Sequence, residues 1–157
     1  MEENGRATVR AICVSEVRGV QKREVSEAYL RREHGVEGDA HAGPWHRQVS
    51  LLSASSVERL QERVDFPLVP GAFAENILVD GLDVWTLPVG TRLTVGGALC
   101  EVTQIGKQCH NDCAIRRAAG DCVMPREGVF VRVLRSGAVK KGDAVALVKP
   151  ESGEDAV

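Results

Sequence analysis

The sequence lacks an excess of charge of either sign, with 20 Lys and Arg against 22 Asp and Glu and a formal net charge of −2. No general basic field therefore argues for nucleic acid, and any anion site must be built from a few local cations. No apolar run approaches the roughly 18–20 residues of a membrane span. The first ten residues, MEENGRATVR, lack the hydrophobic segment of a signal peptide. We expect a cytoplasmic protein with no nucleic-acid partner and no membrane partner.

The sequence also lacks an even set of cysteines, since it contains five, and it shows no secretory signal. An odd count in this context argues against a disulfide framework. In a reducing compartment, thiols are core filler, metal ligands or reactive groups. Cys13 and Cys100 lie inside apolar runs, so we expect both in the core. The remaining three are Cys109, Cys113 and Cys122.

The length of 157 residues fits one domain, and 43% of the residues are hydrophobic, as in a globular core. Short runs of β-branched and apolar residues, separated by glycine, predict an all-β barrel or sandwich. The predicted strands are 7–14, 24–30, 48–52, 76–79, 92–95, 99–105, 129–134 and 144–148.

Two helices interrupt this β pattern. Val57, Leu60 and Val64 recur at helical spacing, which predicts an amphipathic helix over 54–64. Ser53 and Ser55 are both candidate N-caps for it. A second, helix-like insert covers 111–119.

The densest group of reactive residue types is Gly106 to Cys113, GKQCHNDC. It follows a predicted strand and precedes the predicted helix 111–119, so Cys109 is expected near unsatisfied helix N–H groups. Lys107 and His110 flank this thiol, and both influences favour the nucleophilic thiolate. The alternative, that Cys109 is only a small buried residue, fits its polar neighbours less well.

A zinc site is a second interpretation of the same segment, with Cys109, Cys113, Cys122 and His110 as ligands. The spacing C-x3-C-x8-C differs from the paired C-x2-C motifs of zinc ribbons. It also lacks the third closely spaced cysteine of a compact iron–sulfur loop. Zinc binding stays open as an alternative.

A loop rich in Gly, Asp and His over 33–45 is long for a compact domain, and such loops often carry function. It contains Asp39 and His41, and His46 and Arg47 follow it. Arg47 is the best single candidate for binding a phosphate or carboxylate, because its guanidinium donates two parallel hydrogen bonds.

Two further loops contain polar candidates whose residue types also suit purely structural roles. Glu75 and Asn76 precede a strand and can bind a ligand or fix their own loop, and without context we favour the second role. Arg126 lies in the loop 124–128, where the alternative is a turn with solvated charges.

Together these segments resemble the MOSC family, named for the C-terminal domain of molybdenum cofactor sulfurase. The resemblance covers nearly the whole chain, roughly Thr8 to Lys149, and depends on the order and spacing of its pieces. These are GVEGDAH at 35–41, Arg47 entering a strand, FAENI at 73–77, the single Cys109 after a β-hairpin, and a C-terminal hairpin from Gly137 to Gly142-Asp143.

The resemblance implies a mainly β fold, a closed or nearly closed β-barrel with short helical insertions. It places the domain at 7–149, between a flexible N-terminus (1–6) and a disordered acidic tail (150–157). Cys109 is then the residue that carries sulfur or ligates molybdenum held by molybdopterin. The expected cofactor-binding residues are His41, Arg47, Glu75, Asn76, Lys107 and Arg126, with Asp39, His110 and Cys113 in support.

Among family members, this chain is similar to the small standalone type. The resemblance implies a carrier that binds molybdenum cofactor, with partners in cofactor biosynthesis or sulfur donation. One alternative is a molybdenum-dependent reductase of N-hydroxylated compounds, with Cys109 as the metal ligand. Another is a zinc-stabilised structural domain. We expect His41, Arg47, Glu75 and Asn76 to share a cleft with an accessible Cys109 at the barrel rim.

Overall fold

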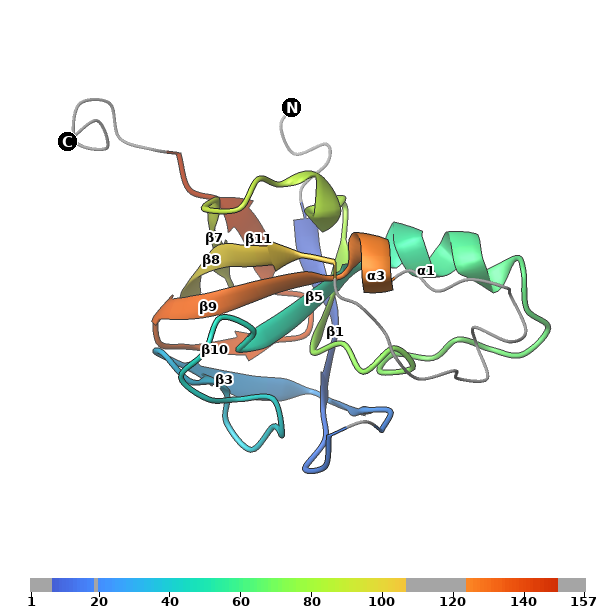
Figure 1. Ribbon diagram of the computed structural model, residues 1–157, viewed down its shortest axis with the longest axis horizontal. Helices are drawn as coiled ribbons and strands as arrows, with labels where there is room; N and C mark the ends of the chain where they lie inside the picture. Colours follow the sequence, from blue (N-terminus) through green and yellow to red (C-terminus); the bar gives the residue numbers. More distant parts are fainter. Residues whose placement is uncertain (1–6, 19, 107–123, 150–157) are drawn as a thin grey trace.

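The computed structural model describes residues 7–18, 20–106 and 124–149, and its core is a closed β-barrel (Figure 1). The helical elements are α1 (Ala54–Gln61), the 3-10 helix η1 (Val84–Thr86) and α3 (Met124–Glu127). The strands are β1 (Ala7–Val14), β2 (Arg23–Val25), β3 (Glu27–Arg31), β4 (Gly35–Val36), β5 (Val49–Ser53), β6 (Ile77–Asp80), β7 (Arg92–Val95), β8 (Ala98–Ile105), β9 (Val129–Arg135), β10 (Gly137–Lys140) and β11 (Ala144–Leu147).

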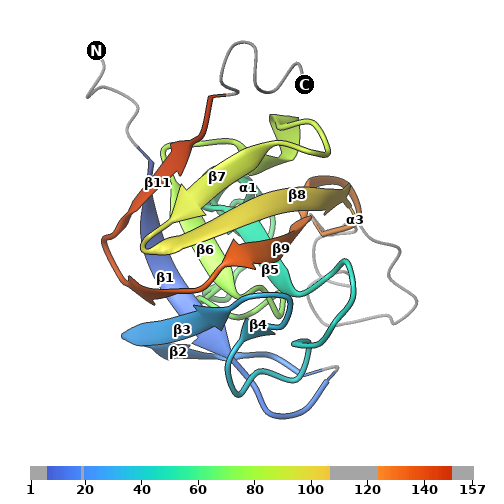
Figure 2. The same ribbon diagram turned by 90° about the vertical axis from the view of Figure 1, so that its left-hand side faces the viewer.

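Seven strands form the barrel in the order β11-β7-β8-β9-β5-β6-β1, and β1 pairs with β11 to close it (Figure 2). At this seam Ala7 lies opposite Val145. Only the β5–β6 pair is parallel, and the other barrel pairs are antiparallel. A smaller sheet, β10-β3-β4, adjoins the barrel. The mainly β fold and the closed barrel predicted above are confirmed.

The barrel interior is filled with β-branched and other apolar side chains, as in other small barrels. Ile12, Val49, Ile77 and Val131 are completely buried there, together with Cys100. Burying one such aliphatic side chain contributes about 1.5–3 kcal/mol. Because the interior is solid, a ligand site must lie at an end of the barrel or on its outer surface.

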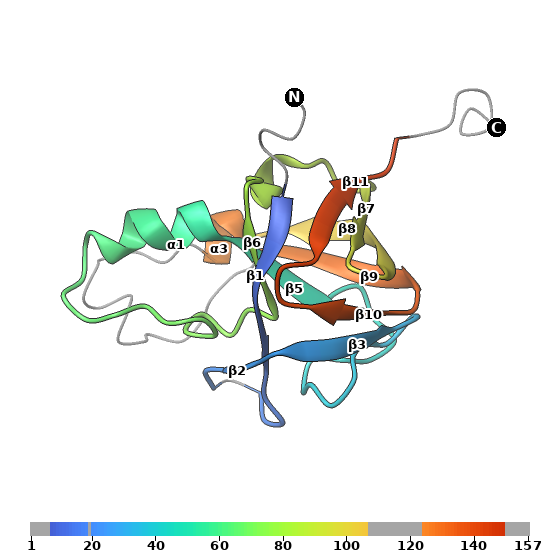
Figure 3. The ribbon, with the colours of Figure 1, turned by 180° about the vertical axis from the view of Figure 1, so that it is seen from behind.

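Helix α1 lies outside the barrel (Figure 3), and a second apolar layer packs beneath it. Leu60 of α1 packs there with Leu52, Phe130 and Cys13. This layer follows from the parallel β5–β6 pair, because parallel neighbours need a crossover connection and α1 lies on it. Cys13 and Cys100 are both buried in apolar clusters, which confirms their predicted core roles.

Two predicted boundaries were wrong. The predicted strand 24–30 is divided into β2 and β3, which pair with different partners. The helix predicted to reach Val64 ends at Gln61, whose side chain donates to Phe66 O (2.8 Å) and accepts from Leu68 N (2.8 Å). These two bonds hold the following turn against the helix end.

The predicted caps of α1 also differ from the structure. Ser53 occupies the N-cap position, but its hydroxyl donates to Leu82 O and accepts from Val84 N, both at 2.8 Å, instead of capping the helix. Ser55 lies within the helix, and its hydroxyl donates to Asp83.

The predicted C-terminal hairpin is wrong as well, because β10 pairs with β3 whereas β11 pairs with β7 and β1. The chain leaves the barrel at Gly137, where a Cβ atom would lie 2.1 Å from the carbonyl carbon of Gly97. Only glycine permits this approach of two backbones.

Three further expectations, for 1–6, for helix 111–119 and for the tail 150–157, lie outside the described residues. No helix in the part of the chain that the structure describes is long and apolar enough to span a membrane.

Candidate functional site

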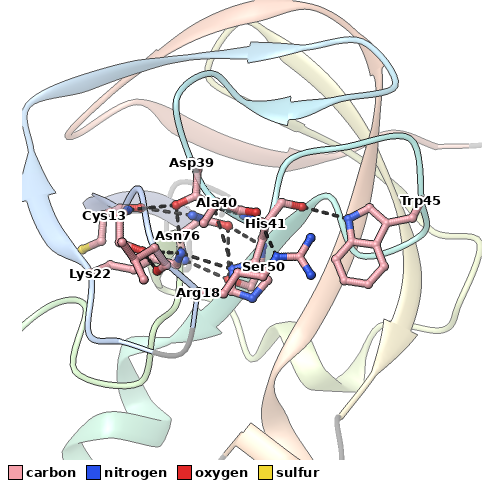
Figure 4. A network of polar contacts seen from close by, with 11 residues as sticks. Cys13, Arg18, Lys22, Asp39, Ala40, His41, Trp45, Ser50 and Asn76 are labelled. Carbon is pink, nitrogen blue, oxygen red and sulfur yellow. Dashed lines mark hydrogen bonds and ion pairs between the residues drawn. The ribbon is translucent and has the colours of Figure 1, made fainter.

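A buried lysine, Lys22, lies between the end of β1 and the start of β2 (Figure 4). Its side chain is fully enclosed, and its Nζ atom lies 2.8 Å from Oδ1 of Asp39, whose side chain is also 0% exposed. Buried charges must be paired and hydrogen-bonded to be tolerated. Nζ also lies 3.3 Å from Ser15 Oγ and 3.2 Å from His41 Nδ1. We call these four residues the Lys22 cluster.

Asp39 anchors the Lys22 cluster through both of its carboxylate oxygens. Besides Lys22, Oδ1 accepts from Ser15 N at 3.0 Å, and Oδ2 accepts from His41 N at 3.0 Å. Burial by itself would raise the pKa of Asp39, but the hydrogen bonds from Lys22, Ser15 N and His41 N outweigh it and lower that pKa. Asp39 is therefore ionised at neutral pH, and the pair with Lys22 is a charged one.

Glu75 lies behind the Lys22 cluster and is 1% exposed. Its carboxylate accepts from Gly71 N (2.7 Å) and Phe73 N (3.1 Å). Burial raises the pKa of Glu75, against the effect of these hydrogen bonds and of the Lys22 charge. Gly71 has φ +90°, and a Cβ there would lie 2.0 Å from Lys22 O. Glycine at this position lets the Glu75 loop lie directly against the Lys22 backbone.

Asn76, completely buried, joins three strands of the barrel wall. Its side-chain oxygen accepts from Ser50 N at 3.0 Å, and its amide donates to Cys13 O at 3.1 Å. Both polar ends of Asn76 are thus engaged by backbone groups, as are both oxygens of Glu75. These contacts match the structural role that we favoured, and binding of cofactor by either residue stays a prediction.

Arg47 lies next to the Lys22 cluster, on an aromatic surface that we call the Arg47 site (Arg18, Trp45, Arg47 and Phe130). Its guanidinium carbon lies 4.7 Å from the ring centroid of Trp45 and 5.6 Å from that of Phe130. Arg18 approaches the Trp45 ring at 5.4 Å. These are cation–π distances. Arg47 Nε is buried and has no hydrogen-bond partner among the residues described.

Trp45 connects the Arg47 site to the Lys22 cluster. Its indole N–H donates to His41 O at 2.8 Å, and Arg18 Nε donates to Ala40 O at 3.1 Å (Figure 4). Asp39 and His41 thus contact Lys22 directly, the Lys22 charge acts on Glu75, and Arg47 is linked to His41 through Trp45. Asn76 is bonded to Ser50 and Cys13 instead.

Gly106, the last residue described before 107–123, is linked by hydrogen bonds to the residue that precedes Arg47. His46 Nε2 contacts Gln104 Oε1 at 2.9 Å, and Gln104 Nε2 donates to Gly106 O at 2.8 Å. Gly106 N in turn donates to Gly128 O at 2.5 Å. Gly106 and Gly128, which lie on opposite sides of 107–123 in the sequence, are therefore bonded to each other, and Gly106 is linked to His46 through Gln104.

Several predicted site residues lie outside the described part of the chain: Lys107, Cys109, His110, Cys113 and Cys122. The loop predicted at 124–128 is wrong, because residues 124–127 form the short helix α3, which contains Arg126. Its neighbour Glu127 attaches α3 to α1 through Arg59, with an N–O distance of 2.7 Å, and through Ser56. Within residues 7–18, 20–106 and 124–149, no group of three His, Cys, Asp or Glu residues is placed to hold a metal ion.

Sequence reasoning missed Lys22, Ser15, Arg18 and Trp45. Lys22 and Arg18 belong to a charged segment, 16–23, that has the composition of a solvent-exposed turn, so nothing marked either cation as special. Trp45 did carry a signal, because a large aromatic residue in a loop rich in glycine and histidine is uncommon and has to be packed against something.

Comparison with known families and structures agrees with this fold. The MOSC domain model matches residues 37–146, more than half of the chain. The YuaD protein of Bacillus subtilis has a similar structure, with 17% identity, a TM-score of 0.76, and coverage of 90% of this chain and 95% of that one. YiiM of Geobacillus stearothermophilus has 21% identity, a TM-score of 0.70 and coverage of 94% and 77%.

YiiM of Escherichia coli is similar too, with 23% identity, a TM-score of 0.62 and coverage of 94% of this chain and 71% of that one. No match was found among curated proteins. At such identities the solved structures support the fold, and the family model supports the membership. The chain belongs to the MOSC domain family.

Proposed function

We propose that this protein binds molybdenum cofactor through its molybdopterin and uses Cys109 as a sulfur carrier during cofactor maturation. The observation that carries the proposal is Arg47. Its guanidinium is held between two aromatic rings, and its buried Nε has no partner in the described part of the chain. A fixed guanidinium whose Nε has no partner among the described residues fits a ligand that brings hydrogen-bond acceptors, such as the phosphate of molybdopterin.

The local charges favour the same class of ligand. Arg18 and Arg47 both lie against Trp45. The carboxylate of the neighbouring Lys22 cluster, Asp39, is already neutralised by Lys22. Because the chain as a whole carries a net charge of −2, attraction of an anion has to come from such local cations.

Cys109 is proposed to act next to this anion site. Cys109 lies three positions after Gly106 in the sequence, and three positions of chain span at most about 11 Å. Gly106 itself is connected through Gln104 to His46, the neighbour of Arg47. Cys13 and Cys100 are poor alternatives. Burial, above all, raises the pKa of each thiol to about 12, which suppresses the reactive thiolate.

In this proposal Arg47 binds and orients the phosphate, and Trp45 holds Arg47 in place. Cys109 would supply a thiolate at the reactive end of the ligand, and molybdopterin, when bound, would supply its dithiolene sulfur. His41 and Arg126 are further candidates for contacts with the pterin or its phosphate.

Metal and pterin analysis of the purified protein is the first test. The carrier function predicts bound pterin with little metal. Near-stoichiometric molybdenum with pterin would instead identify a reductase, in which Cys109 ligates the metal. Zinc without pterin would identify a structural domain and would end the proposal.

Titration with molybdopterin is the second test. Arg47→Ala should weaken binding, and Arg47→Lys should recover only part of it, because an ammonium cannot donate the two parallel bonds of a guanidinium. Arg63→Ala, in the exposed turn after α1, is a matched control and should bind as the wild type does. Equal affinity for wild type and Arg47→Ala would remove Arg47 from the site.

A further inference from the structure

The ammonium group of Lys22 has three polar neighbours, the same number as its N–H bonds. They are Asp39 Oδ1 at 2.8 Å, His41 Nδ1 at 3.2 Å and Ser15 Oγ at 3.3 Å. An ammonium group donates three hydrogen bonds and accepts none. Each of the three neighbours must therefore act as an acceptor.

Two of these acceptors are settled by their other contacts. Asp39 is a carboxylate that also accepts backbone hydrogen bonds. Ser15 Oγ donates its own hydrogen to Val17 O at 2.8 Å, which leaves its lone pairs for Lys22. The third acceptor is His41 Nδ1. A histidine nitrogen that accepts carries no hydrogen, so in a neutral ring the hydrogen is on Nε2.

We propose that Lys22 is a positioning residue that holds His41 as the Nε2–H tautomer, so that His41 serves oxyanions and not metal cations. The ring is also held from its backbone. His41 N donates to Asp39 Oδ2 at 3.0 Å, and His41 O accepts from Trp45 at 2.8 Å. The side chain is 21% exposed, so the ring reaches the surface beside the Arg47 site.

The selectivity follows from where the ring hydrogen lies. A metal bound at Nε2 needs the lone pair there, which moves the hydrogen to Nδ1. That hydrogen would then point at the Lys22 ammonium, 3.2 Å away, and the metal would add a second positive charge nearby. A phosphate oxygen instead accepts from the existing Nε2–H group. The choice of phosphate rests on the proposed function, whereas the tautomer is argued from the contacts within the Lys22 cluster.

Long-range proton–nitrogen correlation spectra of protein labelled with 15N-histidine test the tautomer directly. His41→Gln assigns the His41 signals, and His46, which is exposed, provides an internal reference. In the ligand-free wild type at neutral pH, we expect a protonated Nε2 and an unprotonated Nδ1 at His41. A protonated Nδ1 in the wild type overturns the proposal, whether or not molybdopterin binds.

Two variants separate this role from a merely structural one. In Lys22→Met, the His41 hydrogen should move to Nδ1 and face Asp39 Oδ2, which lies 3.9 Å away. Ser15→Ala is the matched control: it removes one neighbour of Lys22 but keeps the contact with His41, so the tautomer should not change. An unchanged Nε2–H tautomer in folded Lys22→Met overturns the proposal. If that variant does not fold, the wild-type and Ser15→Ala spectra decide.

The ligand preference is tested on the wild type with inorganic phosphate and with zinc ions. Phosphate should shift the His41 Nε2 signal, and zinc should leave the His41 signals in place. A shift with zinc, or no response to saturating phosphate, overturns the anion preference. If the phosphate and zinc results are as expected but the protein does not bind molybdopterin, the proposed function is wrong and this inference still holds.

Discussion

Two ion pairs, Arg10–Asp80 and Lys22–Asp39, differ in how far they are exposed to solvent. Arg10 and Asp80 form a bidentate pair at 2.5 and 2.7 Å, but their side chains are 45% and 38% exposed. Lys22 and Asp39 share a single 2.8 Å contact, and both side chains are 0% exposed. By geometry the first pair is the better one. The buried pair should nevertheless affect the free energy of unfolding far more, because removing either partner leaves an uncompensated charge away from water.

The difference also separates structural from functional use of charge. Arg10 and Asp80 hold two neighbouring strands together, and Arg10 also lies 3.5 Å from Glu58 of α1, a pair that is exposed to solvent as well. Lys22 is shared among Asp39, Ser15 and His41, so its charge determines how a neighbouring side chain is protonated. The predictions below test this contrast, beginning with the largest effect.

Lys22→Met should lower the free energy of unfolding by about 3–5 kcal/mol, because Asp39 is then buried without its cation. Chemical denaturation at neutral pH measures the change. Lys22→Met combined with Asp39→Leu should recover part of the loss, since the variant then buries no charge. A loss below about 1 kcal/mol for the single variant would show that Asp39 reaches water, and the contrast with Arg10 would disappear.

Arg47→Ala should weaken molybdopterin binding by about ten- to a hundredfold, from the 1.5–3 kcal/mol typical of a hydrogen bond to a charged group. Its unfolding free energy should change much less than that of Lys22→Met, because the described residues hold no ion-pair partner for Arg47. Calorimetric titration and thermal unfolding give the two quantities. A drop in stability similar to that of Lys22→Met would make Arg47 a structural residue.

The buried pair should also respond to acid. The pKa of Asp39 is lowered in the folded protein, so its contribution to stability is complete above the ordinary aspartate pKa of about 3.9. That contribution is lost as the pH falls through the lowered folded-state pKa. Between neutral pH and pH about 2, the wild type should therefore lose more stability than Asp39→Asn. Parallel losses in the two proteins would contradict an ionised Asp39.

Arg10→Met should change the unfolding free energy by no more than about 1 kcal/mol, the usual range for exposed pairs. What remains of its contribution should decrease further in high salt. Denaturation of wild type and variant at low and high salt checks both points. A loss as large as that of Lys22→Met would mean that the bidentate geometry matters more than burial.

The barrel was largely predictable because its signal is local. β1 was predicted with its observed limits, Ala7–Val14, since β-branched and apolar residues in a short run fit a pleated, buried surface. The ends of elements were less predictable. The helix stops at Gln61 through side-chain bonds to the next turn, and β10 takes β3 as its partner from far earlier in the chain.

The site was predictable only in part, for the same reason. Asp39, His41 and Arg47 could be chosen as candidates because they lie in or directly after a long polar loop, and such loops often carry function. Lys22 did not, because its character comes entirely from burial against Asp39, seventeen positions away along a connection of three short strands. No local pattern distinguishes such a lysine from a solvated one.

The seam between β1 and β11 has a consequence for the order in which the protein folds. The two strands come from opposite ends of the sequence, so during synthesis at about 5–20 residues per second β1 waits for its partner until nearly the whole chain has been made. Until then β7 has an unpaired edge, and so does the Ala7–Thr8 end of β1, whose Ile12–Val14 end pairs with β2. Joining segments so distant is slow, because chain entropy is lost before the new contacts form. A chain truncated before β11 would keep both edges open, and open strand edges are templates for pairing with a second molecule.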